Sequence, residues 1–422
     1  MRKISEEKRL AKNKQIAETK NQTLERHSHM QVKTFTVKIQ ENKLTKQQKE
    51  SLDRLFLEVK WFKNHILNWS RQSEENKIYK FDTKIKEVIK KDKDMNDVPV
   101  KLQYLSSQMK QSIQNQIVSN IKTLHTLKEK GLQKCGMLRF SKEENCVGLT
   151  QFHVSYKILS SKRISIQNLG KKGFQVNGLD QFISIPDIEY TNARLLRKAT
   201  GIYFQIVCYI PKENKNVEKI NKVLGIDFGC STAFTTSEGE KVDVKIQESE
   251  RLKRLQKDLS RKTKGSKNFN KTKLKIRKEY QKITNRKDDI SNKLVHKFCQ
   301  YETVVIQDEQ LSNWKKNRHG KTVQYSVLGR VKSKLKQKSN VVVLSKTAPT
   351  TKLCTNCGEY HDELKIYDRT FKCNCGVCED RDIHAAKNMV WMFNHKVGME
   401  RTNLKRMEMK ALVDQIIFNQ NN

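Results

Sequence analysis

A cluster of cysteines between Cys354 and Cys378 limits what the C-terminal part of the chain can fold into. Cys354-Thr-Asn-Cys357-Gly is followed by Cys373-Asn-Cys375-Gly-Val-Cys378. Two thiol pairs at this spacing are typical of a tetrahedral zinc ribbon. Five thiols compete for four places, so we expect Cys354, Cys357, Cys373 and Cys375 to bind structural Zn²⁺, with Cys378 as the alternative fourth ligand. The absence of a βαβ pattern after the first pair disfavours a thioredoxin-like redox site.

An acidic residue ends an apolar segment earlier in the chain. Asp227 lies in Val-Leu-Gly-Ile-Asp-Phe-Gly, which predicts a central strand. A carboxylate there is costly unless a cation neutralises it. Gly225 and Gly229 would allow a close backbone approach and a tight exit from the strand. An Asp that only caps the strand end is the alternative.

A second acidic position follows the apolar segment Thr303–Ile306, which also predicts a strand. The next residues are Gln307, Asp308 and Glu309. Side chains alternate between the two faces of a strand, so Gln307 and Glu309 share a face and Asp308 points to the other. One of the two acids, not both, is therefore expected to join Asp227.

The third acidic position opens a predicted helix, Asp382-Ile-His-Ala-Ala-Lys-Asn. Ala385 and Ala386 would let this helix pack closely on a sheet and direct its first turn at the other carboxylates. An N-cap is the alternative role for Asp382. Three carboxylates from separate elements can hold two Mg²⁺ ions for hydrolysis of a phosphodiester.

The charge of the whole chain points to a polyanionic partner. Lys and Arg number 85 against 46 Asp and Glu, a net charge of +39. Cations that neutralise phosphates release condensed counterions, whereas an enzyme of small metabolites gains nothing from such self-repulsion. We find neither a run of about 18 apolar residues nor a signal-like N-terminus, so we expect a protein of the prokaryotic cytosol with no membrane partner.

The order of predicted elements indicates several domains of mixed α/β and β-barrel type. Short alternating segments between Cys146 and Ile210 predict a small barrel, which the early strand at 32–39 is expected to join. Helical patterns from 45 to about 140 would then be an insertion. Strands, long charged helices at 245–300 and acids at strand ends predict an RNase H-like domain after residue 222.

These motifs together resemble TnpB proteins and the miniature type V CRISPR effectors of subtype F. The resemblance rests on Gly-Ile-Asp227-Phe-Gly, the strand ending in acids, the cysteine pairs, Asp-Arg-Asp382-x-x-Ala-Ala-x-Asn, and the segment 319–337. It covers roughly residues 222–392 and implies an RNA-guided DNA endonuclease. The implied partners are a guide RNA and a double-stranded and single-stranded DNA target, with a homodimer on one guide RNA as a further possibility.

The resemblance also implies a domain organisation and a set of catalytic residues. Asp227, Glu309 and Asp382 are expected to bind magnesium and to be catalytic. The expected parts are a basic N-terminal arm (1–30), a wedge barrel (31–44 and 141–212), a helical recognition domain (45–140), a linker (213–222), a RuvC-like nuclease domain (223–345 and 379–422) and the zinc ribbon (346–378), which is expected to bind the target nucleic acid.

The sequence departs from the family pattern in three places. The family more often has Glu where this chain has Gln307, so we expect Glu309, on the same strand face, to be the second metal ligand rather than Asp308. The second cysteine pair is Cys-x-Cys instead of Cys-x-x-Cys, and His384 replaces a usual Asn. The alternative functions are a transposase or junction resolvase acting without guide RNA, and a guided DNA-binding protein that no longer cuts.

Overall fold

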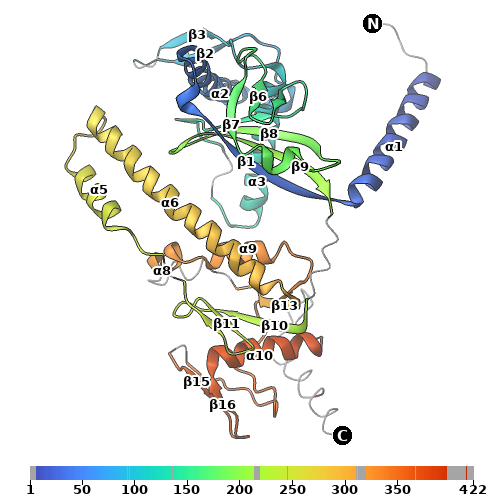
Figure 1. The fold of residues 1–422 in the computed structure, drawn as a ribbon, viewed down its shortest axis with the longest axis vertical. Helices are drawn as coiled ribbons and strands as arrows, with labels where there is room; N and C mark the ends of the chain where they lie inside the picture. Colours follow the sequence, from blue (N-terminus) through green and yellow to red (C-terminus); the bar gives the residue numbers. More distant parts are fainter. Residues whose placement is uncertain are drawn as a thin grey trace. The chain divides into compact units, whose positions relative to one another are not determined.

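The computed structural model describes residues 6–92, 94, 96–134, 137–212, 219–244, 246–309, 311, 320–365, 367–396 and 415. It divides into two compact units, Met1–Asn214 and Lys215–Asn422, and each is described by itself (Figure 1). Most of the expected linker, and most of the chain after residue 396 that was assigned to the nuclease domain, lie outside the described residues. No helix in the described ranges is both long and apolar enough to cross a bilayer.

A barrel-like antiparallel sheet forms the first unit. Its order is β4-β8-β9-β1-β7-β6-β5. The early strand β1 pairs with β9 along most of its length and with β7 at its end, so the prediction that it joins the later strands is confirmed. Sequence reasoning missed β8, whose polar and apolar residues alternate poorly. The strands are β1 Met30–Ile39, β4 Cys146–Leu149, β5 Tyr156–Ser160, β6 Arg163–Ile166, β7 Phe174–Asn177, β8 Glu189–Lys198 and β9 Gly201–Pro211.

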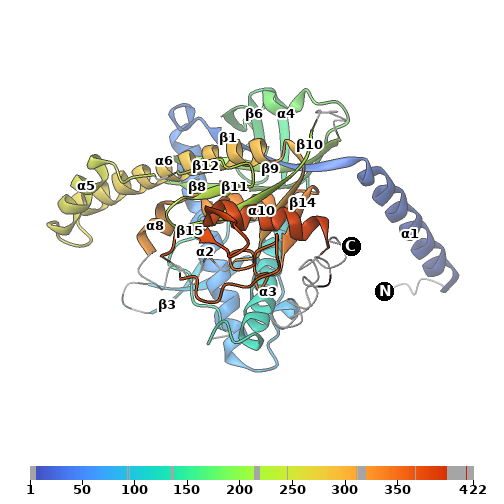
Figure 2. The same cartoon turned by 90° about the horizontal axis from the view of Figure 1, so that it is seen from below.

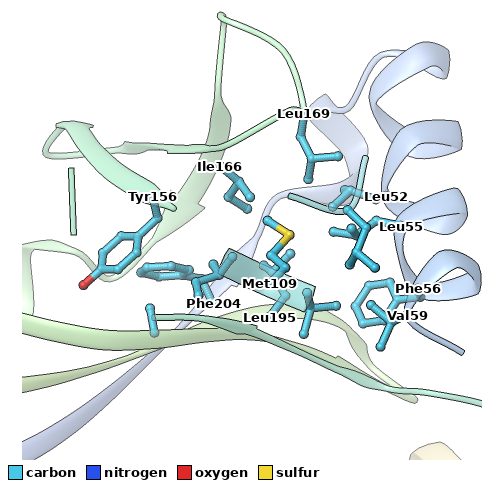
Figure 3. Packing of buried hydrophobic residues seen from close by; sticks show 14 of the residues in the cluster. Leu52, Leu55, Phe56, Val59, Met109, Tyr156, Ile166, Leu169, Leu195 and Phe204 are labelled. Atoms are coloured by element: carbon cyan, nitrogen blue, oxygen red, sulfur yellow. The ribbon is translucent and has the colours of Figure 1, made fainter. Parts of the chain in front are cut away.

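Helices inserted between β1 and β4 complete the core of this unit. Helix α2 (Lys46–Gln72) begins at a capping box in which Thr45 and Gln48 bind each other's backbone N–H groups. Apolar side chains of α2 and α3 (Ser107–Glu129) pack with those of the strands in one continuous core (Figure 3). The insertion was expected to be helical throughout, but it also contains a hairpin of β2 (Glu87–Lys91) and β3 (Asp97–Lys101).

Glu58 fastens α2 to the segment that leads into α3. Its carboxylate is fully buried and accepts hydrogen bonds from three consecutive backbone N–H groups, those of Gln103, Tyr104 and Leu105, at 2.9, 2.9 and 3.0 Å. Arg54 lies one turn earlier on α2 and contacts the same carboxylate at 3.3 Å. The buried carboxylate is therefore stabilised by three backbone hydrogen bonds and one ion pair.

The N-terminal arm is a helix. Helix α1 (Glu6–Ser28) ends two residues before β1, and its last turn is held to the sheet by Arg26 and His27, which both contact Glu189 on β8. Shorter helical turns complete the first unit: 3-10 helices at Glu41–Lys43 and Ile78–Lys80, and α4 at Asp180–Ile183.

A five-stranded mixed sheet, in the order β12-β11-β10-β13-β14, organises the second unit. Strands β10, β13 and β14 are parallel, β11 runs antiparallel to β10, and β12 runs antiparallel to β11. The strand β10 begins slightly before the expected domain boundary. The strands are β10 Ile220–Phe228, β11 Phe234–Thr236, β12 Lys241–Val242, β13 Tyr301–Gln307 and β14 Val341–Leu344.

Helices cover both faces of this sheet. Leu224, Ile226, Val304 and Ile306 face α6 and α9, whereas Val305 packs with α10. The long charged helices expected at 245–300 are present as α5 and α6, and their hairpin reaches well past the edge of the sheet (Figure 2). The helices are α5 Glu250–Ser260, α6 Lys267–Phe298, α8 Gly320–Tyr325, α9 Leu328–Leu335 and α10 Arg381–Asn394, and a small hairpin of β15 Thr370–Lys372 and β16 Cys378–Asp380 precedes α10.

We predict that Glu58→Ala destabilises the first unit by about 3 kcal/mol, because three consecutive backbone N–H groups lose their acceptor. Chemical denaturation followed by circular dichroism measures the change. Glu50→Ala, at an exposed position of the same helix, is the control and should change stability little. Equal stability of the two variants would contradict the assigned role of Glu58.

Candidate active site

Strand pairing places Asp227, Gln307 and Glu309 on the same face of the sheet. The parallel register of β10 and β13 sets Gly225 beside Val305 and Ile226 beside Ile306, which brings Asp227 level with Gln307. Side chains two residues apart share a face. Because Val305 packs against α10, Asp227 and Glu309 also belong to the face that α10 covers.

The helix α10 touches strand β10 through backbone atoms. A Cβ atom added to Gly225 would lie 2.0 Å from the carbonyl oxygen of Ala386, so only glycine fits here. Ala385 and Ala386 are both buried in this contact. Gly229, just after β10, is also required to be glycine, because a Cβ atom there would lie 2.4 Å from the carbonyl oxygen of Thr232. The expected close packing is thus present, and it brings the first turn of α10 to the end of β10.

Asp382 is in that first turn and is not the N-cap of the helix. Asp380 is the N-cap, and its carboxylate accepts hydrogen bonds from the backbone N–H groups of Asp382 and Ile383 at 3.1 and 3.2 Å. Lys241 on β12 also binds Asp380, at 2.6 Å. The capping role that sequence reasoning left open for Asp382 therefore belongs to its neighbour, and the Asp382 carboxyl group is available for other contacts.

Glu309 and Asp382 are close enough to Asp227 to perturb its carboxyl group. Burial raises the pKa of Asp227 well above its usual value, and the negative charges of Glu309 and Asp382 raise it further. Burial also raises the pKa of Glu309 to about 7, against the opposing effect of Lys332. The Oε2 atom of Glu309 is buried and has no hydrogen-bond partner within the described residues. A divalent cation with oxygen ligands would relieve both the repulsion and the missing partner, so the residues fit Mg²⁺.

Asp308 points away from this group. Its carboxylate binds Lys336 and lies 3.4 Å from Lys332, both on the side of α9. The hydrogen bond from Lys336 and the charge of Lys332 hold the pKa of Asp308 below its usual value. Lys332 is itself buried and also donates to the backbone carbonyl of Glu309. The alternation predicted for the strand end thus continues past Gln307.

Gln307 has a structural role. Its buried amide nitrogen contacts three backbone carbonyls, those of Ser345, Lys346 and Ala348, at 3.2, 3.4 and 2.7 Å. Its amide oxygen accepts a hydrogen bond from the Thr350 hydroxyl at 3.0 Å. Gln307 therefore fixes the segment that leads from β14 into the cysteine cluster.

Two arginines near Asp382 were not singled out from the sequence. Arg369 reaches from the segment before β15 to within 4.0 Å of the Asp382 carboxylate, and it donates a hydrogen bond to the Ser231 hydroxyl at 2.7 Å. Arg381 lies 3.6 Å from the same carboxylate and lowers the pKa of Asp227. The position of Arg381 beside Asp382 could have suggested it, but no spacing in the sequence connects Arg369 with the acids.

The structure brings four thiols together in the predicted combination. The sulfur atoms of Cys354, Cys357, Cys373 and Cys375 all lie within 4.8 Å of one another. Cys354 and Cys375 are 3.6 Å apart, and Cys357 and Cys373 are 3.4 Å apart. In a tetrahedral site with Zn–S bonds of about 2.3 Å, sulfur atoms are about 3.8 Å apart. The cluster therefore fits a structural zinc ion, and Cys378 lies outside it.

His384 joins α10 to this cluster. One ring nitrogen contacts the carboxylate of Glu379 and the other the carbonyl oxygen of Leu353, both at 2.8 Å. The ring also stacks on Phe371 of β15, with ring centroids 3.6 Å apart. The residue that departs from the family pattern is therefore a packing and hydrogen-bonding link between α10 and the hairpin.

Comparison with known protein families gives two matches. Residues 205–318 match the OrfB_IS605 family, described as "Probable transposase", and residues 325–389 match the "Cas12f1-like, TNB domain". The resemblance to TnpB proteins and miniature type V effectors is confirmed. The second match contains the whole cysteine cluster and Asp382.

Two curated relatives carry the name of an endonuclease. A "Putative RNA-guided DNA endonuclease" of Streptomyces pristinaespiralis is 33% identical over 177 residues, which are 40% of this chain and 44% of that protein. "Putative RNA-guided DNA endonuclease InsQ" of Escherichia coli (strain K12) is 25% identical over 256 residues, 52% of this chain and 64% of the relative. The chain thus spans about half the length of the curated relatives it matches.

We predict that Gly225→Ala lowers the stability of the second unit by about 2 kcal/mol or more, because the new methyl group would overlap the backbone of α10. Thermal unfolding measures the effect. Gly329→Ala is the matched control, since its Cβ atom would meet only Leu311 at an ordinary 3.9 Å. A Gly225→Ala protein as stable as the Gly329→Ala protein would contradict the close approach of β10 and α10.

We also predict that the effect of Glu309→Gln on stability depends on pH and on magnesium. At pH 8 the substitution should stabilise the protein without Mg²⁺, whereas the wild type should be the more stable of the two with Mg²⁺. The folded chain holds the Glu309 proton more tightly than the unfolded chain, so without metal the wild type loses stability between about pH 4.5 and pH 7, by on the order of 1 to 3 kcal/mol. In a chelator at pH 8 the variant should therefore melt at a higher temperature than the wild type, and at pH 4 the two should melt alike.

Added Mg²⁺ at pH 8 should raise the melting temperature of the wild type above that of the variant, because the cation binds the ionised carboxylate. Asp308→Asn is the control and should respond to Mg²⁺ as the wild type does. A Glu309→Gln protein stabilised by Mg²⁺ as strongly as the wild type would show that Glu309 is no metal ligand.

Proposed function

We propose that this chain is an RNA-guided DNA endonuclease that cuts by Mg²⁺-dependent phosphodiester hydrolysis. The observation that carries the proposal is that Glu309, after β13, and Asp382, on α10, raise the pKa of the buried Asp227 on β10. Their mutual repulsion costs stability in the absence of a cation, which is typical of a site built to bind one. The strand order β12-β11-β10-β13-β14, in which β11 alone of the five runs in the opposite direction, supports an RNase H-like, RuvC-type domain.

The roles of the residues follow from their positions. Asp227, Glu309 and Asp382 would hold the metal ions, which supply an activated water and stabilise the leaving oxygen of the phosphodiester. Arg369 and Arg381 carry positive charge beside Asp382 and would bind the phosphate that is cut. Lys332 holds the backbone at Glu309 and keeps Asp308 turned away from the substrate side.

The nucleic-acid partners are proposed from charge and from the relatives' names. The net charge of +39 suits a long polyanion. Lys271, Lys273, Lys275 and Lys278 are exposed along α6 and would contact a phosphate backbone. The barrel and its helical insertion in the first unit would act as the wedge and recognition domains, which grip the guide RNA and the duplex next to the target.

One second function is favoured by a specific observation, because the family match over residues 205–318 is described as a transposase. A transposase or resolvase would use the same carboxylates without a guide. The first experiment therefore expresses the chain within its own genomic neighbourhood, purifies it and sequences the RNA that accompanies it. A discrete RNA with a variable end supports the guided reaction, and the mass of the purified complex gives the number of chains on that RNA.

We predict that Asp227→Ala, Glu309→Gln and Asp382→Ala each lower the rate of guided cleavage by roughly 1,000-fold, since loss of a metal ligand removes several kcal/mol of transition-state stabilisation. Cleavage of a plasmid that carries the target measures the rate, and RNA recovery should be unchanged. Asp308→Asn is the matched control and should cleave normally. Loss of cleavage in Asp308→Asn with normal cleavage in Glu309→Gln would assign the ligand to Asp308, and cleavage without RNA would favour the transposase or resolvase.

A further inference from the structure

The ribbon contains a second group of metal-binding atoms beside the four thiols. A carboxylate oxygen of Glu359, a ring nitrogen of His361 and the sulfur of Cys373 all lie within 4.8 Å of one another. The Oε2 atom of Glu359 is 3.2 Å from the Cys373 sulfur and 3.8 Å from the Nε2 atom of His361. Cys373 also belongs to the four-thiol cluster, so the two groups share one ligand.

The state of His361 points to a missing partner. The side chain is more than nine-tenths buried, and its Nε2 atom has no hydrogen-bond partner among the described residues. The other ring nitrogen, Nδ1, lies 2.8 Å from the carboxylate of Glu363. A carboxylate accepts a hydrogen bond, so Nδ1 donates, and the tautomer with its proton on Nδ1 has its lone pair at Nε2. A histidine held by a carboxylate on one nitrogen and free on the other is the usual form of a zinc-binding histidine.

The distances suit a small divalent ion. Metal–ligand bonds of about 2.0 to 2.3 Å place the ligand atoms of a tetrahedral site roughly 3.3 to 3.8 Å apart. The two distances from Glu359 Oε2 lie close to this range. The Glu359 side chain is also 43% exposed, so an ion can reach the group from solvent, and water can fill the fourth position.

Electrostatics favour a second cation at this place. Four thiolates carry more negative charge than one Zn²⁺ neutralises, and the carboxylate of Glu359 adds to the excess directly beside Cys373. A thiolate sulfur has enough lone pairs to bind two zinc ions at once. A second ion bound to Cys373 would therefore reduce the repulsion between Glu359 and the thiolate cluster.

We propose that Glu359, His361 and Cys373 form a second zinc site, which shares the Cys373 thiolate with the four-cysteine site. Its open coordination position, with three protein ligands instead of four, makes it the weaker of the two sites. The inference concerns the ribbon alone and stands independently of the proposed nuclease activity.

The test is a zinc count on the full chain after equilibration with a small excess of Zn²⁺. Mass spectrometry gives the bound zinc per chain before and after treatment with a mild chelator. The wild type should bind one more zinc ion than either His361→Ala or Glu359→Gln, and the chelator should remove this extra ion first. The difference between proteins is the readout, because carboxylates elsewhere can also bind zinc.

Asp362→Asn is the control, since it removes a carboxylate from the same segment and leaves the three proposed ligands in place. It should retain the extra ion. Glu359→Gln decides the matter if His361→Ala fails to fold, because Glu359 is the more exposed side chain. Equal zinc content in the wild type and the Glu359→Gln protein, or loss of the extra ion in Asp362→Asn as well, would overturn the proposal.

Discussion

Strand β10 and helix α10 meet through their backbones at Gly225 and Ala386, and the candidate site depends on this contact. A side chain at Gly225 would hold the helix away from the sheet. With glycine there, the first turn of α10 comes down beside the end of β10, and Asp382 reaches the surroundings of Asp227. Two carboxyl groups far apart in the sequence thus become neighbours without any attraction between them, and the packing energy of the sheet and helix opposes their repulsion.

The end of β13 distributes its polar side chains by the same geometric rule. Alternation sends Gln307 and Glu309 to the face of α10 and Asp308 to the lysines on the side of α9. Each of the three has a different environment. The amide of Gln307 lies among backbone carbonyls, the carboxylate of Asp308 is paired with lysines, and the half-buried carboxyl group of Glu309 has one oxygen without a partner among the described residues. Burial without a partner raises the pKa of Glu309 to about 7, whereas the lysines lower that of Asp308. The contrast arises from neighbours that the local sequence does not contain.

The sequence was sufficient to predict the strands around Asp227 and Ile306, the helix after Asp380 and the four clustered thiols, because each has a strong local pattern. It also predicted that the first strand returns to the later ones. It failed at β8, whose polar and apolar residues alternate poorly. It also failed at the hairpin of β2 and β3, two short strands that pair with each other within a stretch expected to be helical. Arg369 escaped notice for a different reason. Its proximity to Asp382 exists only after the ribbon has folded.

The hydrogen bonds of Gln307 restrict how this site can change in evolution. The commoner family pattern has Glu at this position, yet here a carboxylate would face the carbonyl oxygens of Ser345 and Ala348 and could donate nothing to them while ionised. A single substitution of Gln307 by Glu would therefore remove the hydrogen bonds that hold the segment leading into the ribbon, and this loss would offset any gain from a new metal ligand. Substitution of Glu309 alone would remove the proposed ligand without a replacement. The two arrangements are thus separated by unfavourable single-step intermediates, and a lineage that acquires one of them tends to keep it.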